Sequence, residues 1–156
     1  MKHAAARQKW ANMSNYVRLH ALTGEGGIYL DTDVEVIKSF DDLLSVPAFV
    51  GCESRRPKIN NAVCGSVSGH PFFKRMISLI ENRFHGSEKA NLTAPELLTY
   101  LLKEHGYTEY SEHAQNIANV MVFPTRYFYP FHFSESLTPQ CITPDTYTIH
   151  YWDKRW

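Results

Sequence analysis

The hydrophobic pattern changes its period along the chain, and these changes predict an α/β protein. Apolar residues recur every three to four positions in residues 71–84 and 95–105, which is the period of an amphipathic helix. Short apolar runs instead predict strands over residues 28–36, 48–52, 59–67, 119–123 and 147–152. Residues 38–44 predict a short capped turn or helix, and residues 124–144 a loop region rich in proline and aromatic residues. The alternation of the two periods indicates a mixed sheet flanked by helices.

A further helix is predicted directly before the first strand. Ser14 is a candidate N-cap, and Val17, Ala21 and Leu22 fall on one face at helical spacing. The glycine cluster of residues 24–27 is expected to end this helix, so that the strand starts immediately afterwards.

The first predicted strand contains two carboxylates one residue apart, Asp31 and Asp33. Residues i and i+2 of a strand project to the same side, so the two side chains are expected to converge on one cation. Hard oxygen ligands suit Mg²⁺ or Mn²⁺, and such an ion bridges a nucleotide diphosphate when it keeps open coordination positions. The alternative interpretation is an aspartate-rich turn after a core strand, because such tripeptides are common by chance.

The residues around these carboxylates resemble the sugar-binding-region family of glycosyltransferases, the group with a D-x-D signature. That family includes yeast-type mannosyltransferases, capsular polysaccharide enzymes and the glucosylating clostridial toxins. Its pattern S-D-x-x-R-x-x-x-L, followed by G-G-x-Y-x-D-x-D, is matched here by Ser14, Arg18, Leu22, Gly26, Gly27, Tyr29, Asp31 and Asp33. The resemblance implies a GT-A-like fold that binds a nucleotide-diphospho-sugar.

Shorter segments extend the resemblance downstream. Residues 60–66 and 69–73 are similar to the family's asparagine-bearing strand, G-H-P turn and helix. Residues 93–95 resemble its T-G-P turn, and residues 150–156 its H-H-x-x-x-S-W ending. The match therefore runs in order over roughly residues 12–156.

The chain departs from the family pattern in several places. Asn15 stands where the family usually has aspartate, and an amide binds sugar hydroxyls without bringing charge. Ala94 replaces a glycine, and residues 154–155 are Lys and Arg where the family has small residues. Family members usually open with a strand, helix and strand that hold the base and ribose. We therefore expect an N-terminally truncated form, whose nucleotide pocket a partner chain or a dimer completes.

The resemblance also implies roles for individual residues. Arg18, Asp31 and Asp33 are the expected catalytic residues: Asp33 binds the metal, Asp31 mainly binds the sugar or ribose, and Arg18 lies against the donor sugar. Asp31, His150 and Asp153 are further candidates for the metal shell. The expected substrate-binding residues are Asn15, Tyr29, Asn60, Asn61 and Trp156.

Each of these residues also has a structural interpretation. Arg18 can pair with an acidic neighbour on a helix face, Tyr29 can lie in the core, and His150 can be a hydrogen-bonded structural histidine. Asn60 or Asn61 can cap a strand.

Composition favours one soluble domain that spans residues 1–156. The chain is 44% apolar and 21% charged, and its 16 basic residues balance its 16 acidic ones. This balance argues against a nucleic-acid partner. No apolar run approaches the roughly 20 residues of a membrane span, so we expect no transmembrane segment and a cytoplasmic location, peripheral at the inner face of the membrane. Three widely spaced cysteines argue against a disulfide framework and a zinc site.

The predicted function is metal-dependent transfer of a hexose from a UDP- or GDP-sugar to a saccharide or lipid-linked saccharide, with retention, in polysaccharide or capsule biosynthesis. One alternative is a haloacid-dehalogenase-like phosphatase, whose aspartates also form D-x-D after a hydrophobic strand. That family expects Thr or Val at the position of Glu35. The other alternative is a truncated, non-catalytic remnant that binds sugars or serves in assembly.

Overall fold

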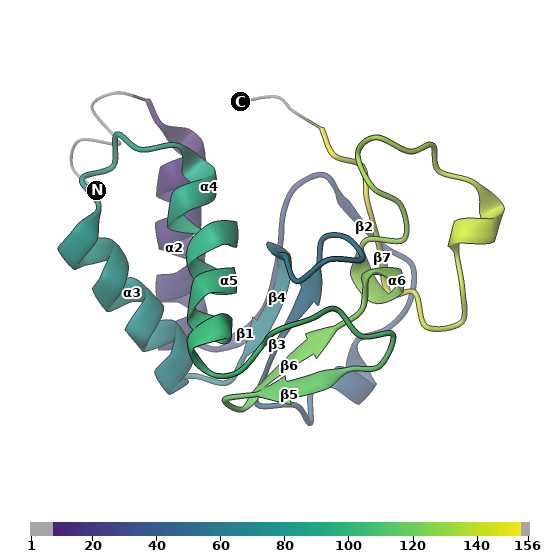
Figure 1. The fold of residues 1–156 in the computed structure, drawn as a ribbon, viewed down its shortest axis with the longest axis horizontal. Coiled ribbons are helices and arrows are strands. Elements are labelled where there is room, and N and C mark those ends of the chain that lie inside the picture. Colours follow the sequence, from purple (N-terminus) through teal and green to yellow (C-terminus); the bar gives the residue numbers. More distant parts are fainter. Residues whose placement is uncertain (1–7, 154–156) are drawn as a thin grey trace.

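The computed structural model describes residues 8–153, and a five-stranded mixed sheet forms its centre (Figure 1). In spatial order the strands are β1 (Gly27–Leu30), β4 (Ile59–Ser66), β3 (Ala48–Cys52), β6 (Val120–Phe123) and β5 (Gln115–Ile117). Neighbouring strands are antiparallel except β3 and β6, which are parallel. Strands β1, β3 and β6 therefore run in the same direction, and their carboxyl ends meet at one edge of the sheet.

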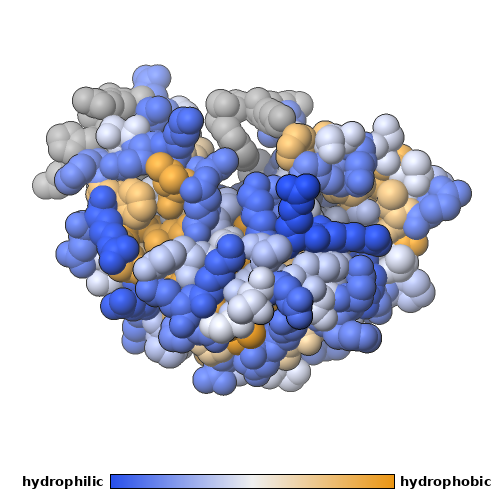
Figure 2. All heavy atoms as spheres, in the orientation of Figure 1, coloured by the Kyte–Doolittle hydropathy of each residue, from blue (hydrophilic) through white to orange (hydrophobic). Residues whose placement is uncertain are grey.

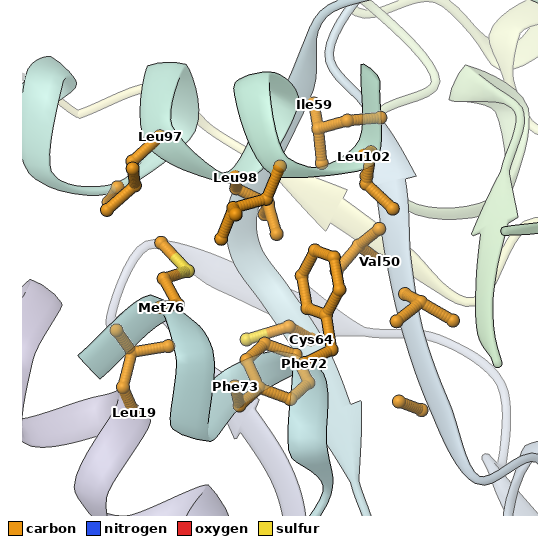
Figure 3. Close-up of a cluster of buried hydrophobic side chains, with 14 of the residues drawn as sticks. Leu19, Val50, Ile59, Cys64, Phe72, Phe73, Met76, Leu97, Leu98 and Leu102 are labelled. Atoms are coloured by element: carbon orange, nitrogen blue, oxygen red, sulfur yellow. The ribbon is translucent and has the colours of Figure 1, made fainter. Parts of the chain in front are cut away.

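Helices cover one side of this sheet, as Figure 1 shows. They are α2 (Trp10–Gly24), α3 (Pro71–Arg83), the short α4 (Ala90–Thr93) and α5 (Pro95–Glu104). Their apolar faces pack with the sheet in a core that includes Leu19, Val50, Phe73, Met76, Leu98 and Leu102, all almost fully buried (Figure 3). No helix in the described part of the chain is long and apolar enough to cross a bilayer.

A two-stranded sheet joins the segment after β1 to the end of the chain. It pairs β2 (Val34–Val36) with β7 (Thr148–His150) in antiparallel register. The 3₁₀ turn η1 (Asp41–Leu43) follows β2. The segment between β6 and β7 contains α6 (Thr125–Phe128) and a second 3₁₀ turn, η2 (Pro139–Cys141). A second core of mostly aromatic residues supports it; its members include Phe49, Phe123, Phe128, Tyr129 and Tyr147.

The face of the molecule in Figure 2 is largely hydrophilic. Apolar side chains gather over the helices and over the loop region at the opposite end. Hydrophilic residues occupy the surface between these two places, in front of the edge where the strands end.

Most predicted elements are confirmed, but the long strand over residues 28–36 is wrong. The strand stops at Leu30, and β2 starts at Val34 after a turn in which the Val34 N–H donates to the Asp31 carbonyl at 3.2 Å. The reason is that β1 pairs with β4 whereas β2 pairs with β7, so the chain must leave one sheet for another. Asp31 and Asp33 therefore flank a turn instead of sharing one side of a strand.

The start and the buried face of the first helix are also corrected. Helix α2 begins at Trp10, so Ser14 is not an N-cap. Val17 is 59% exposed and Ala21 is exposed as well. The buried residues are Asn12, Asn15, Arg18, Leu19 and Leu22. Polar side chains of this helix are buried because they find hydrogen-bond partners inside the protein. Asn15 binds the Ala90 carbonyl of α4, and Arg18 binds the Asn61 carbonyl of β4.

A close backbone approach in the sheet gives a stability prediction. At Gly65, which pairs with Phe49 across β3 and β4, an added Cβ would lie 2.2 Å from the Phe49 ring. Gly65→Ala is therefore expected to lower the free energy of unfolding by about 1–3 kcal/mol, because the ring must move in a packed core. Urea unfolding measures this change. Gly24→Ala is the matched control, since its Cβ meets nothing within 4 Å, and an equal loss in both variants would contradict the account.

Candidate active site

The edge where β1 and β3 end and β4 begins carries polar side chains from several separate segments. Asp31 follows β1, Glu53 follows β3, and Asn60 and Asn61 open β4. Ligand sites of open α/β sheets commonly lie outside the carboxyl ends of their strands. A cavity of about 490 Å³ opens at this edge. It is also lined by predicted residues from α2, from the turn between β1 and β2 and from β7 and the residues after it, namely Asn15, Arg18, Asp33, His150 and Asp153.

Asp31, Asp33 and His150 form a compact group of potential metal ligands. Each offers one ligand atom, and these atoms lie within 4.8 Å of one another. A His150 ring nitrogen, Nε2, is 3.1 Å from Asp33 Oδ2. The pairing of β2 with β7 places His150 opposite Val34, beside the second aspartate. The three residues that the resemblance indicated as metal ligands therefore lie together in the fold, although His150 is far from the two aspartates in the sequence.

The Asp33 carboxylate has an oxygen whose bonding a cation would complete. Asp33 Oδ1 and His150 Nδ1 are buried, and neither has a hydrogen-bond partner in residues 8–153. An unsatisfied buried polar atom destabilises a protein by about 1–3 kcal/mol, so native structures seldom contain one without a ligand or water. Two carboxylates and an imidazole suit Mn²⁺ better than Mg²⁺, because Mg²⁺ prefers oxygen ligands alone. These residues therefore fit a divalent cation.

Burial keeps His150 in the state that binds metals. Desolvation lowers the pKa of its imidazole from the usual value, although the nearby charge of Asp33 acts in the opposite direction. The lower pKa favours the neutral ring at pH 7, and the neutral ring has the free lone pair that a metal requires. Trp152 packs against this ring with centroids 4.2 Å apart and so restricts its orientation.

The chain after β7 turns back over Asp33. Trp152 has a left-handed φ of 58°, which is unfavourable for a bulky residue. Its indole N–H donates to the Phe131 carbonyl at 2.9 Å. The turn brings the Asp153 main-chain N–H to Asp33 Oδ2 at 2.8 Å. Asp153 thus contributes a backbone donor to the site, whereas the described group of metal ligands does not include its carboxylate.

Arg18 is a buried cation in the cavity wall. Its side chain is only 5% exposed and forms an ion pair with Asp31 Oδ1 at 3.0 Å. Arg18 Nη1 also donates to the Asn61 carbonyl at 2.7 Å, and Nη2 donates to Ser14 Oγ at 3.0 Å. The guanidinium lies over the ring of Tyr29, 4.2 Å from its centroid. The helix residue therefore fixes both the first aspartate and the start of β4.

Tyr29 belongs to the same network, although it does not line the cavity. Its hydroxyl donates to Asp31 Oδ1 at 2.7 Å. Burial raises the pKa of this hydroxyl to about 12, which keeps it protonated as a donor. The described contacts thus give Tyr29 a supporting role beneath Asp31.

The three asparagines predicted to bind substrate line the cavity, and the amides of Asn15 and Asn60 already bind groups of the protein. Asn15 Nδ2 donates to the Ala90 carbonyl at 2.9 Å and so ties α2 to α4. Asn60 Oδ1 accepts from the Ala62 N–H at 2.8 Å. Asn61 Nδ2 is a buried donor that has no hydrogen-bond partner in the described part of the chain. Of these three asparagines, Asn61 is therefore the one with an amide donor left for a ligand. Trp156, the remaining predicted substrate-binding residue, lies outside the described residues.

Sequence reasoning missed Glu53 and Lys58, which also line the cavity. Glu53 directly follows β3, as Asp31 directly follows β1, and two parallel strands bring their carboxyl ends to the same edge. The signal in the sequence was the carboxylate of Glu53 immediately after the strand predicted over residues 48–52.

The fold, a mixed sheet flanked by helices, is that of a GT-A-like glycosyltransferase, and a D-x-D pair and a buried arginine lie where its strands end. Residues 66–156 match the family described as "Alpha 1,4-glycosyltransferase conserved region". Residues 1–50 match "Glycosyltransferase sugar-binding region containing DXD motif". The first of these matches covers more than half of the sequence, and the chain belongs to that alpha 1,4-glycosyltransferase family.

Curated relatives are glycosyltransferases as well. The chain is 27% identical to lactosylceramide 4-alpha-galactosyltransferase of Mus musculus, over 98% of this chain and 45% of the relative. It is 25% identical to the Homo sapiens protein of that name, over 98% and 46%. Mannosyl phosphorylinositol ceramide synthase CSH1 of Saccharomyces cerevisiae is 38% identical over 42% of this chain and 17% of the relative. The chain spans about half the length of the galactosyltransferases that it matches.

Proposed function

We propose that this chain carries the donor and metal site of an enzyme that transfers a hexose from a UDP- or GDP-sugar to a saccharide acceptor. The observation that carries the proposal is the grouping of Asp31, Asp33 and His150 beside the buried cation Arg18, in one cavity at the sheet edge. A diphosphate needs positive charge, and sugar hydroxyls need fixed acceptors and donors. The cavity supplies both kinds of group.

Asp31, Asp33 and His150 would hold the cation, and Mn²⁺ suits this donor set. When bound, the ion neutralises the charge that develops on the diphosphate leaving group. Arg18 supplies a second positive charge that is already desolvated and held in place, so little reorganisation is needed as the transition state forms. Asp31 has acceptor capacity left for a sugar hydroxyl, and Asn61 Nδ2 is an available donor.

Retention at the anomeric carbon is part of the proposal. The family and several relatives are named for alpha linkages. A transferase that forms an alpha linkage from an alpha-linked nucleotide sugar retains the configuration.

Glycolipids are the acceptors that we favour. The names of the relatives refer to lactosylceramide and to phosphorylinositol ceramide, which are sphingolipids with saccharide or inositol head groups. We therefore propose a lipid-linked saccharide in preference to a capsular polysaccharide. The expected cytoplasmic location at the inner membrane face, and a partner chain or dimer that completes the nucleotide pocket, stay predictions.

A turnover assay tests this function. The chain would be incubated with UDP-galactose, UDP-glucose or GDP-mannose, with lactosylceramide or inositol phosphoceramide, and with or without Mn²⁺. Mass spectrometry would detect the extended lipid. We expect one donor to react only with Mn²⁺ present, and Asp33→Asn to lose the reaction while Asp41→Asn, a change in the exposed turn η1, keeps it.

The two alternative functions give different results in the same assay. A phosphatase would release phosphate from p-nitrophenyl phosphate, and a non-catalytic remnant would turn over neither type of substrate. Either result would contradict the proposed transferase.

A further inference from the structure

A second, larger cavity adjoins the first. Its volume is about 880 Å³, and Glu53, Lys58 and Phe133 line both cavities. These three residues therefore lie where the two spaces meet. The ligands of the proposed metal, Asp31 and Asp33, line only the first cavity.

Glu53 is a buried carboxylate at this boundary. It is only 8% exposed, and its Oε1 accepts from Lys58 Nζ at 2.7 Å. Its Oε2 accepts from Asn60 Nδ2 at 3.2 Å. Asn60 cannot reverse its amide without losing a bond, because its Oδ1 already accepts from the Ala62 N–H. The carboxylate is therefore fixed in position on both sides.

The loop that contains Glu53 is built to hold it there. The Glu53 N–H donates to the Lys58 carbonyl at 2.9 Å, which closes residues 53–58 into a short loop between β3 and β4. A buried carboxylate is costly unless it is paired, and a well-packed apolar side chain is often at least as stabilising. Each carboxylate oxygen has a second lone pair that can accept from a ligand hydroxyl.

Phe133 adds an aromatic surface to the same boundary. Its side chain is half exposed, and its ring meets Trp152 edge-on with centroids 6.1 Å apart. Saccharides bind where an apolar ring face lies beside a few fixed polar groups. Glu53 and Phe133 together provide this combination.

The charges of the second cavity favour a neutral ligand over a phosphate. Arg126 donates to Asp145 at 2.8 Å and to Glu112 at 3.2 Å, and Arg55 is 3.6 Å from Glu112. Lys58 is paired with Glu53. Three of the four lysine and arginine side chains that line this cavity are thus paired with carboxylates.

We propose that the second cavity binds the acceptor saccharide, and that Glu53 accepts a hydrogen bond from the acceptor hydroxyl that attacks the donor sugar. The hydroxyl oxygen bonds to the anomeric carbon as the bond from that carbon to the nucleoside diphosphate breaks, so that the diphosphate leaves and the hydroxyl proton passes to the Glu53 carboxylate. This proposal rests on the proposed function, because it places the acceptor next to a donor held by Asp31, Asp33 and Arg18. A hydroxyl fixed at the boundary of the two cavities is oriented toward the donor before reaction, which favours transfer to it over transfer to water.

The first experiment measures acceptor binding alone, by calorimetry with lactose and with myo-inositol. We expect the wild-type chain to bind at least one of them, and Glu53→Gln to bind it about tenfold or more weakly, because a bond to a charged acceptor is lost. Phe133→Leu is a second variant in which weaker binding is expected. Glu109→Gln, an exposed carboxylate that lines neither cavity, is the control and should bind as wild type does. No saccharide binding by wild type, or equal binding by Glu53→Gln, would overturn the proposal.

A donor titration separates this inference from the proposed function. Glu53→Gln should bind the nucleotide sugar and Mn²⁺ as wild type does, and its hydrolysis of the donor should stay within about twofold while transfer to the saccharide falls. Equal losses of hydrolysis and transfer would show that Glu53 acts on the donor, against this inference. If wild type binds saccharide but no nucleotide sugar, the proposed function fails while the saccharide site stands.

Discussion

Replacing Asp33 by asparagine is expected to weaken Mn²⁺ binding by at least about 100-fold. Loss of an outer-shell partner typically lowers metal affinity 10- to 100-fold, and Asp33 is expected to be a direct ligand. The substitution keeps the size of the side chain but removes its charge and one acceptor. Asp33 Oδ1 is also a buried oxygen that has no hydrogen-bond partner among the described residues, so a bound ion would satisfy it. Electron paramagnetic resonance of free Mn²⁺ during a titration of the chain measures this affinity.

Asp41→Asn provides the control for that measurement. Asp41 is exposed in η1 and does not line the cavity. Its variant should bind Mn²⁺ as wild type does. Comparable affinity in Asp33→Asn and wild type would mean that the ion binds elsewhere, and the assignment of Asp33 as a metal ligand would then be wrong.

Arg18→Met is expected to lower the free energy of unfolding by about 3–5 kcal/mol. Removing one member of a buried ion pair leaves the other charge uncompensated. Here Asp31 would lose its partner at 3.0 Å, and the Asn61 carbonyl would lose a donor at 2.7 Å. Methionine retains much of the apolar stem, so the loss reports mainly on the charge and its hydrogen bonds. Urea unfolding followed by circular dichroism measures the change.

Arg126→Met is the matched control, because Arg126 forms ion pairs as Arg18 does but its side chain is 29% exposed. Exposed pairs contribute about 0–1 kcal/mol, so this variant should unfold close to wild type. The double variant Arg18→Met/Asp31→Asn should recover part of the loss, since neither buried charge then lacks a partner. Equal losses in the two single arginine variants would contradict the assignment of Arg18 as a buried member of the site.

The sequence predicts the elements well where a single segment carries the signal. Helix α3 and helix α5 begin at Pro71 and Pro95 as expected, and β3 covers residues 48–52 as expected. These segments combine a clear period with a strong start or stop residue. The D-x-D pair and Arg18 are also recognisable from the sequence alone, because a motif of fixed spacing lies within one short stretch of chain.

Long-range pairing limits the rest of the prediction. The local pattern indicates one strand over residues 28–36, because nothing in that run shows that its two halves join different sheets. Residues 124–144 indicate only a loop, yet they contain α6 and support the aromatic core. The sequence also places Val17 on the buried side of α2, since it does not show that Asn15 and Arg18 find polar partners inside. Tertiary contacts override hydrophobic spacing in each case.

Long-range pairing also limits how much of the site can be predicted from the sequence. The proximity of His150 to Asp33 depends on the pairing of β2 with β7, which no local pattern predicts. His150 is nevertheless a candidate through the resemblance alone. Glu53 belongs to no segment of that resemblance, and only the shared direction of β1 and β3 brings it to the same edge.

The most direct test of the central claim is calorimetric titration of the purified chain with UDP-galactose, UDP-glucose and GDP-mannose, each with and without Mn²⁺. The account predicts that one donor binds, that binding requires Mn²⁺, and that Asp33→Asn abolishes it while Asp41→Asn does not. Binding of no donor by the wild-type chain, or binding that is equal with and without Mn²⁺, would contradict the account.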